Sequence, residues 1–160
     1  MRTKALMIKI NVITNNINWF RFIKNPNSYI DKKIGKFNAK DKTFAKKKIY
    51  CTLLLSGNKE IKSLNKKFRK KNKVTDVLSF PFQLNKELAR LLKTEKEVYL
   101  GDIIINLNKI KSKDVKNFKV EFDRLWVHGL VHLFGYDHKK EKDYLKMNKV
   151  EKNYINVINA

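Results

Sequence analysis

"LWVHGLVHLFGYDHKK", residues 125–140, is an almost continuous apolar segment that contains all three histidines of this 160-residue chain. A helix is expected from about Val120 to Phe134, because Gly135 suits the left-handed position just past a helix C-terminus. A helix that is apolar on nearly every side must be buried on nearly every side. We therefore predict that this helix forms the centre of the fold.

Apolar runs and alternating patterns predict the elements around this helix. Strands are expected at residues 6–14, 47–56, 75–82 and 99–107, and helices at 29–37, 58–71 and 140–158. Asn58 is the expected cap of its helix, and Pro81 indicates a strand end or a sheet edge. Residues 83–98 are interpreted as a polar excursion with one helical turn, and residues 108–118 as a short helix or a loop. Interleaved strands and helices favour an α+β or α/β fold with partly antiparallel pairing.

The organisation of the chain favours one unit. No internal repeat and no linker rich in proline, glycine or serine interrupts it, and 160 residues are enough to bury a substantial core. We expect residues 1–160 to form a single domain.

The charge is unusual. There are 37 lysines and arginines against 15 acidic residues, a formal net charge of +22. Such a field attracts polyanions, of which nucleic acid is the most common. An A/T-rich genome, whose codons favour lysine, asparagine and isoleucine, would account for part of the excess. The remainder still favours RNA or DNA as a partner.

Cysteine content and hydropathy predict the compartment. The single cysteine, Cys51, can form neither a disulfide framework nor a cysteine-based zinc site, so we predict a cytoplasmic protein. No apolar stretch approaches the roughly 18 residues of a membrane span. An organelle transit peptide is an alternative, because no acid precedes Asp31, but the alternating "MIKINVIT" at 7–14 favours a strand of the mature fold.

The spacing of the histidines predicts a metal site. His128 and His132 lie one helical turn apart on the same face, and the turn after Gly135 can bring His138 back to a third vertex. The alternative is that backbone groups satisfy each ring. In so apolar a helix, however, two unpaired imidazoles would each cost roughly 1–3 kcal/mol. A shared ion removes that cost.

The ligand types indicate one zinc ion, although imidazole also accepts copper, nickel or iron. Three protein ligands leave a fourth position open, which is the pattern of catalytic zinc. An ion there would polarise a phosphoryl or carbonyl oxygen and lower the pKa of a bound water. Gly129 follows His128 where a zinc protease of the H-E-x-x-H type needs its glutamate, so peptidase chemistry is disfavoured.

Three motifs resemble those of the YbeY endoribonucleases, a family of bacterial ribosomal RNA maturation factors also found in organelles. "HGLVHLFGYDH" at 128–138 is similar to the family's signature, with the three histidines at its ligand positions. "LNKKFRKKNKVTDVLSFPF" at 64–82 resembles a second hallmark block, and "LGDI" at 100–103 a third. The family commonly carries proline at the position of Val74, a departure that removes no chemical group.

The resemblance implies a metal-dependent endoribonuclease specific for single strands. Its role would be ribosomal RNA maturation, especially at the 3′ end of the small-subunit RNA, and ribosome quality control. The implied partners are single-stranded RNA, ribosomal RNA and the small ribosomal subunit, without a membrane. The implied fold is α+β, with a mixed, mostly four-stranded sheet packed with helices and the metal site at the end of a central helix.

The resemblance also implies roles for single residues. Arg69 becomes the expected catalytic phosphate contact, since a guanidinium can hold a phosphoryl oxygen bidentately. On spacing alone it would be a solvated cation at a helix C-terminus. His128 is expected to be catalytic as well as a ligand, and Asp137 either orients an imidazole, accepts a proton or merely shapes its turn. Neighbouring lysines are expected to follow the RNA backbone, namely Lys66, Lys67, Lys70, Lys71 and Lys73.

Two other functions fit the residues. One is a non-catalytic, zinc-containing RNA-binding ribosome assembly factor, which a fourth protein ligand closing the site would support. The other is a metallohydrolase acting on something other than RNA, which a glutamate positioned over the metal would support.

Overall fold

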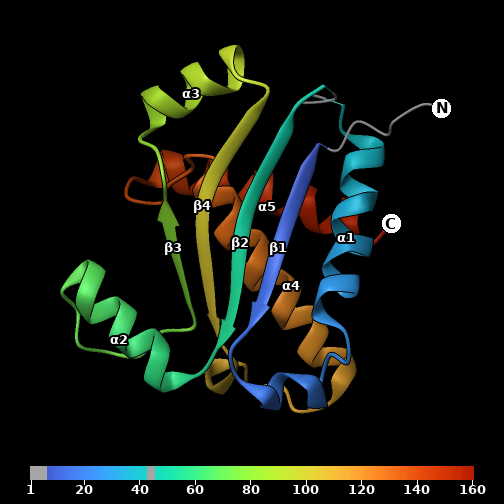
Figure 1. The fold of residues 1–160 in the computed structure, drawn as a ribbon, viewed down its shortest axis with the longest axis vertical. Helices are drawn as coiled ribbons and strands as arrows, with labels where there is room; N and C mark the ends of the chain where they lie inside the picture. The colour runs from blue at the N-terminus through green and yellow to red at the C-terminus, as the bar shows by residue number, and fades with distance from the viewer. Residues whose placement is uncertain (1–6, 43–45) are drawn as a thin grey trace.

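The computed structural model of the protein describes residues 7–42 and 46–160. Its sheet has four strands in the order β1-β2-β4-β3. The strands are β1 (Ile8–Thr14), β2 (Lys48–Ser56), β3 (Val77–Pro81) and β4 (Glu97–Asn106). β1, β2 and β4 are parallel, and the edge strand β3 runs antiparallel to β4. The mixed sheet and its helices confirm the predicted α+β class (Figure 1).

Most of the helical mass lies on one side of the sheet. The helices are α1 (Pro26–Lys40), α2 (Asn58–Arg69), α3 (Asn85–Thr94), α4 (Val115–Leu133) and α5 (Glu141–Ile158). In Figure 1, α4 and α5 lie behind the strands, α1 lies beside β1, and α2 and α3 flank the β3 side. None of the helices in the described part of the chain is both long and apolar enough to cross a membrane.

The main core lies between the sheet and α4. β1 and β2 alternate, so every second side chain faces the helices, and α4 supplies the large buried rings of Phe118, Phe122 and Trp126. A Cβ added at Gly129 would lie 2.6 Å from Cγ2 of Ile103. The glycine therefore lets α4 approach β4 closely, which sets the histidine end of the helix against β3. This packing also explains the missing glutamate after His128.

A β-bulge changes the face on which β4 presents its side chains. Tyr50 of β2 pairs with Tyr99, but Thr52 pairs with Asp102, so β4 carries one extra residue between these pairs. Gly101 absorbs it at φ +137, and a Cβ there would lie 2.2 Å from the carbonyl oxygen of Phe80. As a result, Tyr99 and Asp102 share the face that points away from α4.

Most of the predicted elements are confirmed within about two residues. The first strand begins at Ile8, and Leu6, its predicted first residue, lies outside the described residues. β3 is an edge strand that ends at Pro81, as predicted. Gly135 has φ +101, which agrees with its predicted left-handed position.

Three local predictions were wrong. Residues 83–98 hold a full helix, α3, rather than one turn. The long helix begins at Val115 instead of near Val120, because the Asp114 side chain accepts a hydrogen bond from the Asn117 N–H at 3.1 Å. Asn58 is not the cap of α2, since Gly57 occupies that position. The Asn58 N–H donates instead to Oδ1 of Asn108, far along the chain, at 3.1 Å.

Residues 108–118, predicted to be a short helix or a loop, belong to three elements. They contain the end of a short 3-10 helix (Leu107–Lys109), a loop and the first turn of α4. A second 3-10 helix, Ile17–Arg21, was not predicted; Trp19 anchors it by donating to the Ser56 carbonyl oxygen at 2.9 Å.

Candidate metal centre and its cleft

The three histidines converge at the C-terminal end of α4. Their ligand atoms all lie within 4.8 Å of one another. Nε2 of His128 lies 3.1 Å from Nε2 of His132, and the ring centroids of His132 and His138 are 5.1 Å apart. The turn at Gly135 brings His138 back to the helix end. This group could hold a metal ion.

The outer nitrogens of two histidines have acceptors of their own. Nδ1 of His128 lies 2.5 Å from Oε1 of Glu151 on α5, and Nδ1 of His132 lies 2.8 Å from the carbonyl oxygen of Tyr136. A carboxylate and a carbonyl oxygen only accept, so each Nδ1 carries the proton. In neutral rings the Nε2 atoms then carry no proton.

Two bare nitrogen lone pairs that face each other at 3.1 Å repel unless a cation lies between them. Two nitrogens bound tetrahedrally to one zinc ion, each at about 2.0–2.1 Å, would be roughly 3.4 Å apart. The donor set thus fits a shared transition-metal ion without a change in the backbone. Burial, followed by the charge of neighbouring His128, lowers the pKa of His132 below its ordinary value. This favours the neutral imidazole that a metal requires.

A cleft of about 660 Å³ opens over the histidines. We name it the histidine cleft, and its lining comes from the end of α4, from β3 and from the segment after α2. The lining residues are Arg69, Lys71, Asp76, Val77, Ser79, Pro81, Asn85, His128, His132, Gly135, Tyr136, Asp137, His138 and Lys139. Cations, imidazoles and the carboxylates of Asp76 and Asp137 therefore surround one hollow.

Arg69 is brought into the cleft by the end of α2. Its Nη2 donates to the carbonyl oxygen of Ser79 at 2.8 Å, and its guanidinium lies 5.6 Å from the ring centroid of Phe80. The next residue, Lys70, has φ +56 and turns the chain, so Lys71 enters the cleft lining while Lys70 does not. The buried Asn65 donates to the carbonyl oxygen of Lys73 at 3.0 Å and ties this turn to the helix.

The predicted site residues separate into two groups. The histidine cleft brings together Arg69, Lys71, Asp137 and the three histidines, which come from distant parts of the sequence. Lys66, Lys67, Lys70 and Lys73 are exposed on or just after α2 and do not line it. Asp137 uses Oδ1 to accept the His138 N–H at 2.7 Å, which is the turn-shaping role considered for it.

Sequence reasoning did not identify Glu151 or Asn85. Glu151 follows the buried Met147 by one helical turn, so an acid on the apolar stripe of the last helix was the available signal. Asn85, at the start of α3, donates to the Gly135 carbonyl oxygen at 3.4 Å, and both residues line the cleft. No local sequence pattern predicts that contact, because the two residues are 50 positions apart.

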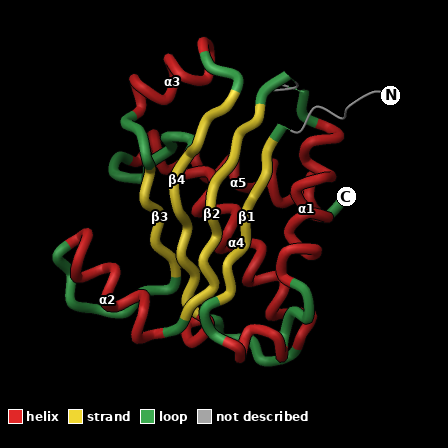
Figure 2. Tube along the Cα trace, in the orientation of Figure 1, coloured by secondary structure: helices red, strands yellow, loops and turns green. Residues whose placement is uncertain are grey.

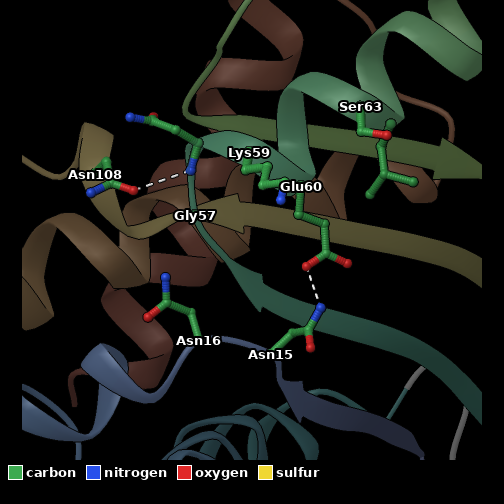
Figure 3. Close-up of a pocket in the computed structure, with 9 residues that line it drawn as sticks. Asn15, Asn16, Gly57, Lys59, Glu60, Ser63 and Asn108 are labelled. Atoms are coloured by element: carbon green, nitrogen blue, oxygen red, sulfur yellow. Dashed lines mark hydrogen bonds between the residues drawn. The ribbon is translucent and has the colours of Figure 1, made fainter.

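A second pocket, of about 580 Å³, lies at the carboxyl ends of β1 and β2 beside the start of α2 (Figure 3). Asparagine side chains dominate it: Asn108 accepts from the start of α2, and Asn15 donates to Glu60. Neither Arg69 nor any of the three histidines lines this pocket, so it is separate from the histidine cleft.

Similarity to known proteins shows the family to which the chain belongs. The model of the family described as endoribonuclease YbeY matches residues 13–159. The chain belongs to the YbeY family. An endoribonuclease YbeY from Pelagibacter ubique is 45% identical over 148 residues, covering 91% of this chain and 92% of the relative. Another, from Ehrlichia canis, is 34% identical with 91% and 88% covered.

A solved structure shares the fold of this chain. The solution structure of a protein from Thermotoga maritima matches with a TM-score of 0.53 and 24% identity, covering 95% of this chain and 89% of that one. The family match also spans β2, which the sequence motifs did not reach, and it begins near the end of β1.

Proposed function

We propose that the protein is a metal-dependent endoribonuclease that cuts single-stranded RNA in ribosomal RNA maturation, at the 3′ end of the small-subunit RNA, and in ribosome quality control. The described residues act as one endoribonuclease domain. The observation that carries the proposal is the convergence of three imidazoles and Arg69 on one cleft. Membership of a family described as endoribonuclease supports it.

The proposed metal is one zinc ion held by His128, His132 and His138. Three neutral nitrogens without a thiolate suit zinc, although another divalent transition metal could bind the same set. When bound, the ion supplies Lewis acidity to a phosphoryl oxygen and a lowered pKa to a water at its open position.

The protein's own groups bind and orient the substrate. Arg69 is already held by the Ser79 carbonyl oxygen, so its remaining N–H groups can grip a phosphoryl oxygen with little loss of freedom. Glu151 and the Tyr136 carbonyl oxygen keep the His128 and His132 rings turned into the cleft. Lys71 and the exposed lysines on and just after α2 attract the RNA backbone.

The form of the cleft favours single strands. Its floor lies at the histidines and its walls are the edge strand β3 and the turn after α2. A flexible strand can bend a phosphodiester into such a hollow, whereas duplex RNA is too stiff and wide. The proposed substrate agrees with the cytoplasmic location predicted from the sequence and with the small-subunit partner that the family resemblance implies.

Two observations weigh against the alternatives. Among the described residues, the metal-ligand group has three members, so no fourth protein ligand closes the site as a structural zinc would require. Glu151 lies behind His128 at its outer nitrogen, rather than over the three inner nitrogens, where a hydrolytic glutamate would lie.

The test is cleavage of matched RNAs by zinc-loaded protein. We expect cutting of labelled single-stranded ribosomal RNA fragments, little cutting of the same sequence in a duplex, and none with His128→Ala. Poor cutting of the 2′-deoxy strand would assign the attack to the ribose hydroxyl. Cutting that persists in His128→Ala would indicate a contaminant, and no cutting of any RNA would favour the assembly factor.

A pair of variants separates chemistry from attraction. Arg69→Ala should lower the cleavage rate sharply with unchanged metal content, whereas Lys70→Ala should mainly weaken RNA binding and its salt dependence. Circular dichroism checks that both variants fold. Equal and small effects would return Arg69 to the role of a solvated cation.

A further inference from the structure

One face of the sheet carries no helix over its middle. In Figures 1 and 2 the strands face the viewer, and no helix of the described residues crosses in front of them. At the α2 end of this face, Ile61 packs with Leu78 and Ile104 in a small second core. The remaining surface we name the open face; it consists of Tyr50, Thr52, Phe80, Phe82, Tyr99 and Asp102.

Strand register places these side chains in rows. Tyr50 pairs with Tyr99 in one row, and Thr52, Asp102 and Phe80 pair across three strands in the next. The bulge at Gly101 makes this arrangement possible, because it turns Asp102 onto the same side as Tyr99. The positions of these side chains therefore depend on the pairing of the strands and not on the conformation of one loop.

Aromatic rings dominate the open face and its rim. Tyr99 lies between Tyr50, at 5.2 Å between ring centroids, and Phe82, at 5.7 Å. Phe80 lies 5.4 Å from Phe68 at the end of α2. Phe82 is 67% exposed and Phe68 59% exposed, which is unusual for rings with no covering element.

Each end of this aromatic surface carries a cation over a ring. Lys48 Nζ lies 5.0 Å from the Tyr50 centroid, and Lys67 Nζ lies 5.2 Å from that of Phe68. The Arg69 guanidinium stands over Phe80. Rings for bases with cations for phosphates are the combination that binds single-stranded nucleic acid without sequence preference.

The open face is continuous with the histidine cleft around the edge strand. Alternation along β3 directs Ser79 and Pro81 into the cleft and Phe80 to the open face. Arg69 spans the edge, since it lines the cleft and lies over Phe80 at the same time. A strand whose phosphate is held by Arg69 can pass directly onto the rings.

We propose that the open face binds the RNA strand beside the cut site by stacking its bases on Phe68, Phe80, Phe82, Tyr99 and Tyr50. The inference rests on the proposed function and adds a substrate-binding surface to it. Asp102 lies in the middle of the face and repels phosphate, so the bases face the sheet and the backbone runs toward the flanking cations.

The test compares strands that do and do not reach the face. Strands of about 12 and about 4 nucleotides, lengths within the range of single-strand sites, are titrated by fluorescence anisotropy in chelator, so that they stay intact. The Phe68→Ala/Phe82→Ala double variant should bind the longer strand at least about tenfold more weakly. Phe20→Ala, an exposed ring outside the face, serves as the matched control and should bind like the wild type.

Two further measurements separate the possible failures. With metal restored, Phe20→Ala should cut both strands at the wild-type rate, and an abasic strand of equal length should bind the wild type and the double variant equally. If the double variant bound the longer strand with the affinity of the wild type, the proposal would be overturned, and a protein partner would become the expected ligand of the open face. A wild type that binds the strand through these rings but cuts no RNA would refute the ribonuclease function alone.

Discussion

His128 is held from two sides, and the second side comes from a helix that carries no part of the signature. Its Nε2 faces His132, while its Nδ1 contacts the Glu151 carboxylate at 2.5 Å. Carboxylates in this position fix the tautomer of a ligating histidine and raise its basicity. Glu151 is thus a positioning residue for the metal centre.

Glu151→Gln tests this role. The amide oxygen can still accept from Nδ1, but the negative charge is lost, so we expect the affinity for zinc to fall roughly 10–100-fold. Competition with a chelating indicator measures it. Glu141→Gln, in the first turn of the same helix, is the matched control and should leave the affinity unchanged. Equal affinities in both variants would reduce Glu151 to a packing contact.

The lowered pKa of His132 predicts how the site responds to acid. Burial and the charge of His128 favour the neutral ring, so at neutral pH the nitrogen is free for metal. Protonation competes only as the pH falls below the ordinary imidazole value of about 6.5. Metal content measured across pH should be constant above that value and decline below it. Release on raising the pH through neutrality would contradict the assignment.

Among the elements, β4 determines both faces of the sheet. Its bulge at Gly101 keeps Ile103 and Ile105 in the core while Tyr99 and Asp102 point away from it. The carbonyl oxygen of Phe80 occupies the space that a side chain at Gly101 would need. The edge strand that walls the histidine cleft therefore depends on this one glycine.

Gly101→Ala should destabilise the protein by at least about 1–3 kcal/mol, because it combines a left-handed φ with a backbone clash. Urea unfolding measures the change. Gly35→Ala is the matched control: it lies in the middle of α1 with open space around it, and should stabilise by about 0.5–1 kcal/mol. Similar unfolding midpoints for both variants would show that the bulge can relax.

At the scale of the whole molecule, the core encloses the only thiol of the chain. Cys51 is fully buried on the helix-covered face of β2. Burial, aided by the charge of Asp102, raises the pKa of Cys51 to about 12. Almost no thiolate exists near pH 8 in the native state, and no reagent can reach it there.

Thiol labelling should therefore report opening of the whole core. At pH 8 we expect the native protein to react with a thiol reagent orders of magnitude more slowly than the urea-unfolded chain, at a rate that follows the unfolding equilibrium. Gly101→Ala should accelerate it and Gly35→Ala should slow it. Rapid labelling of the native wild type would mean that the sheet opens locally at β2.

The local features of the protein were predictable from its sequence. His128 and His132 share a face because a helix repeats every 3.6 residues, and Gly135 ends that helix because few other residues adopt its φ. The four strands follow from apolar runs and alternation. These signals depend on neighbours within a few residues, and in these elements the tertiary contacts agree with them.

The remaining features depend on contacts between distant segments, which only the tertiary structure decided. Asn108 replaced Asn58 as the group that satisfies the start of α2, Glu151 reached His128 from another helix, and the register of β4 placed Tyr99 beside Phe82. The hydrogen bond from Arg69 to the Ser79 carbonyl oxygen holds the guanidinium in the cleft. The physical reason is that hydrogen bonds and packing select their partners by distance in space, whereas periodicity records only distance along the chain.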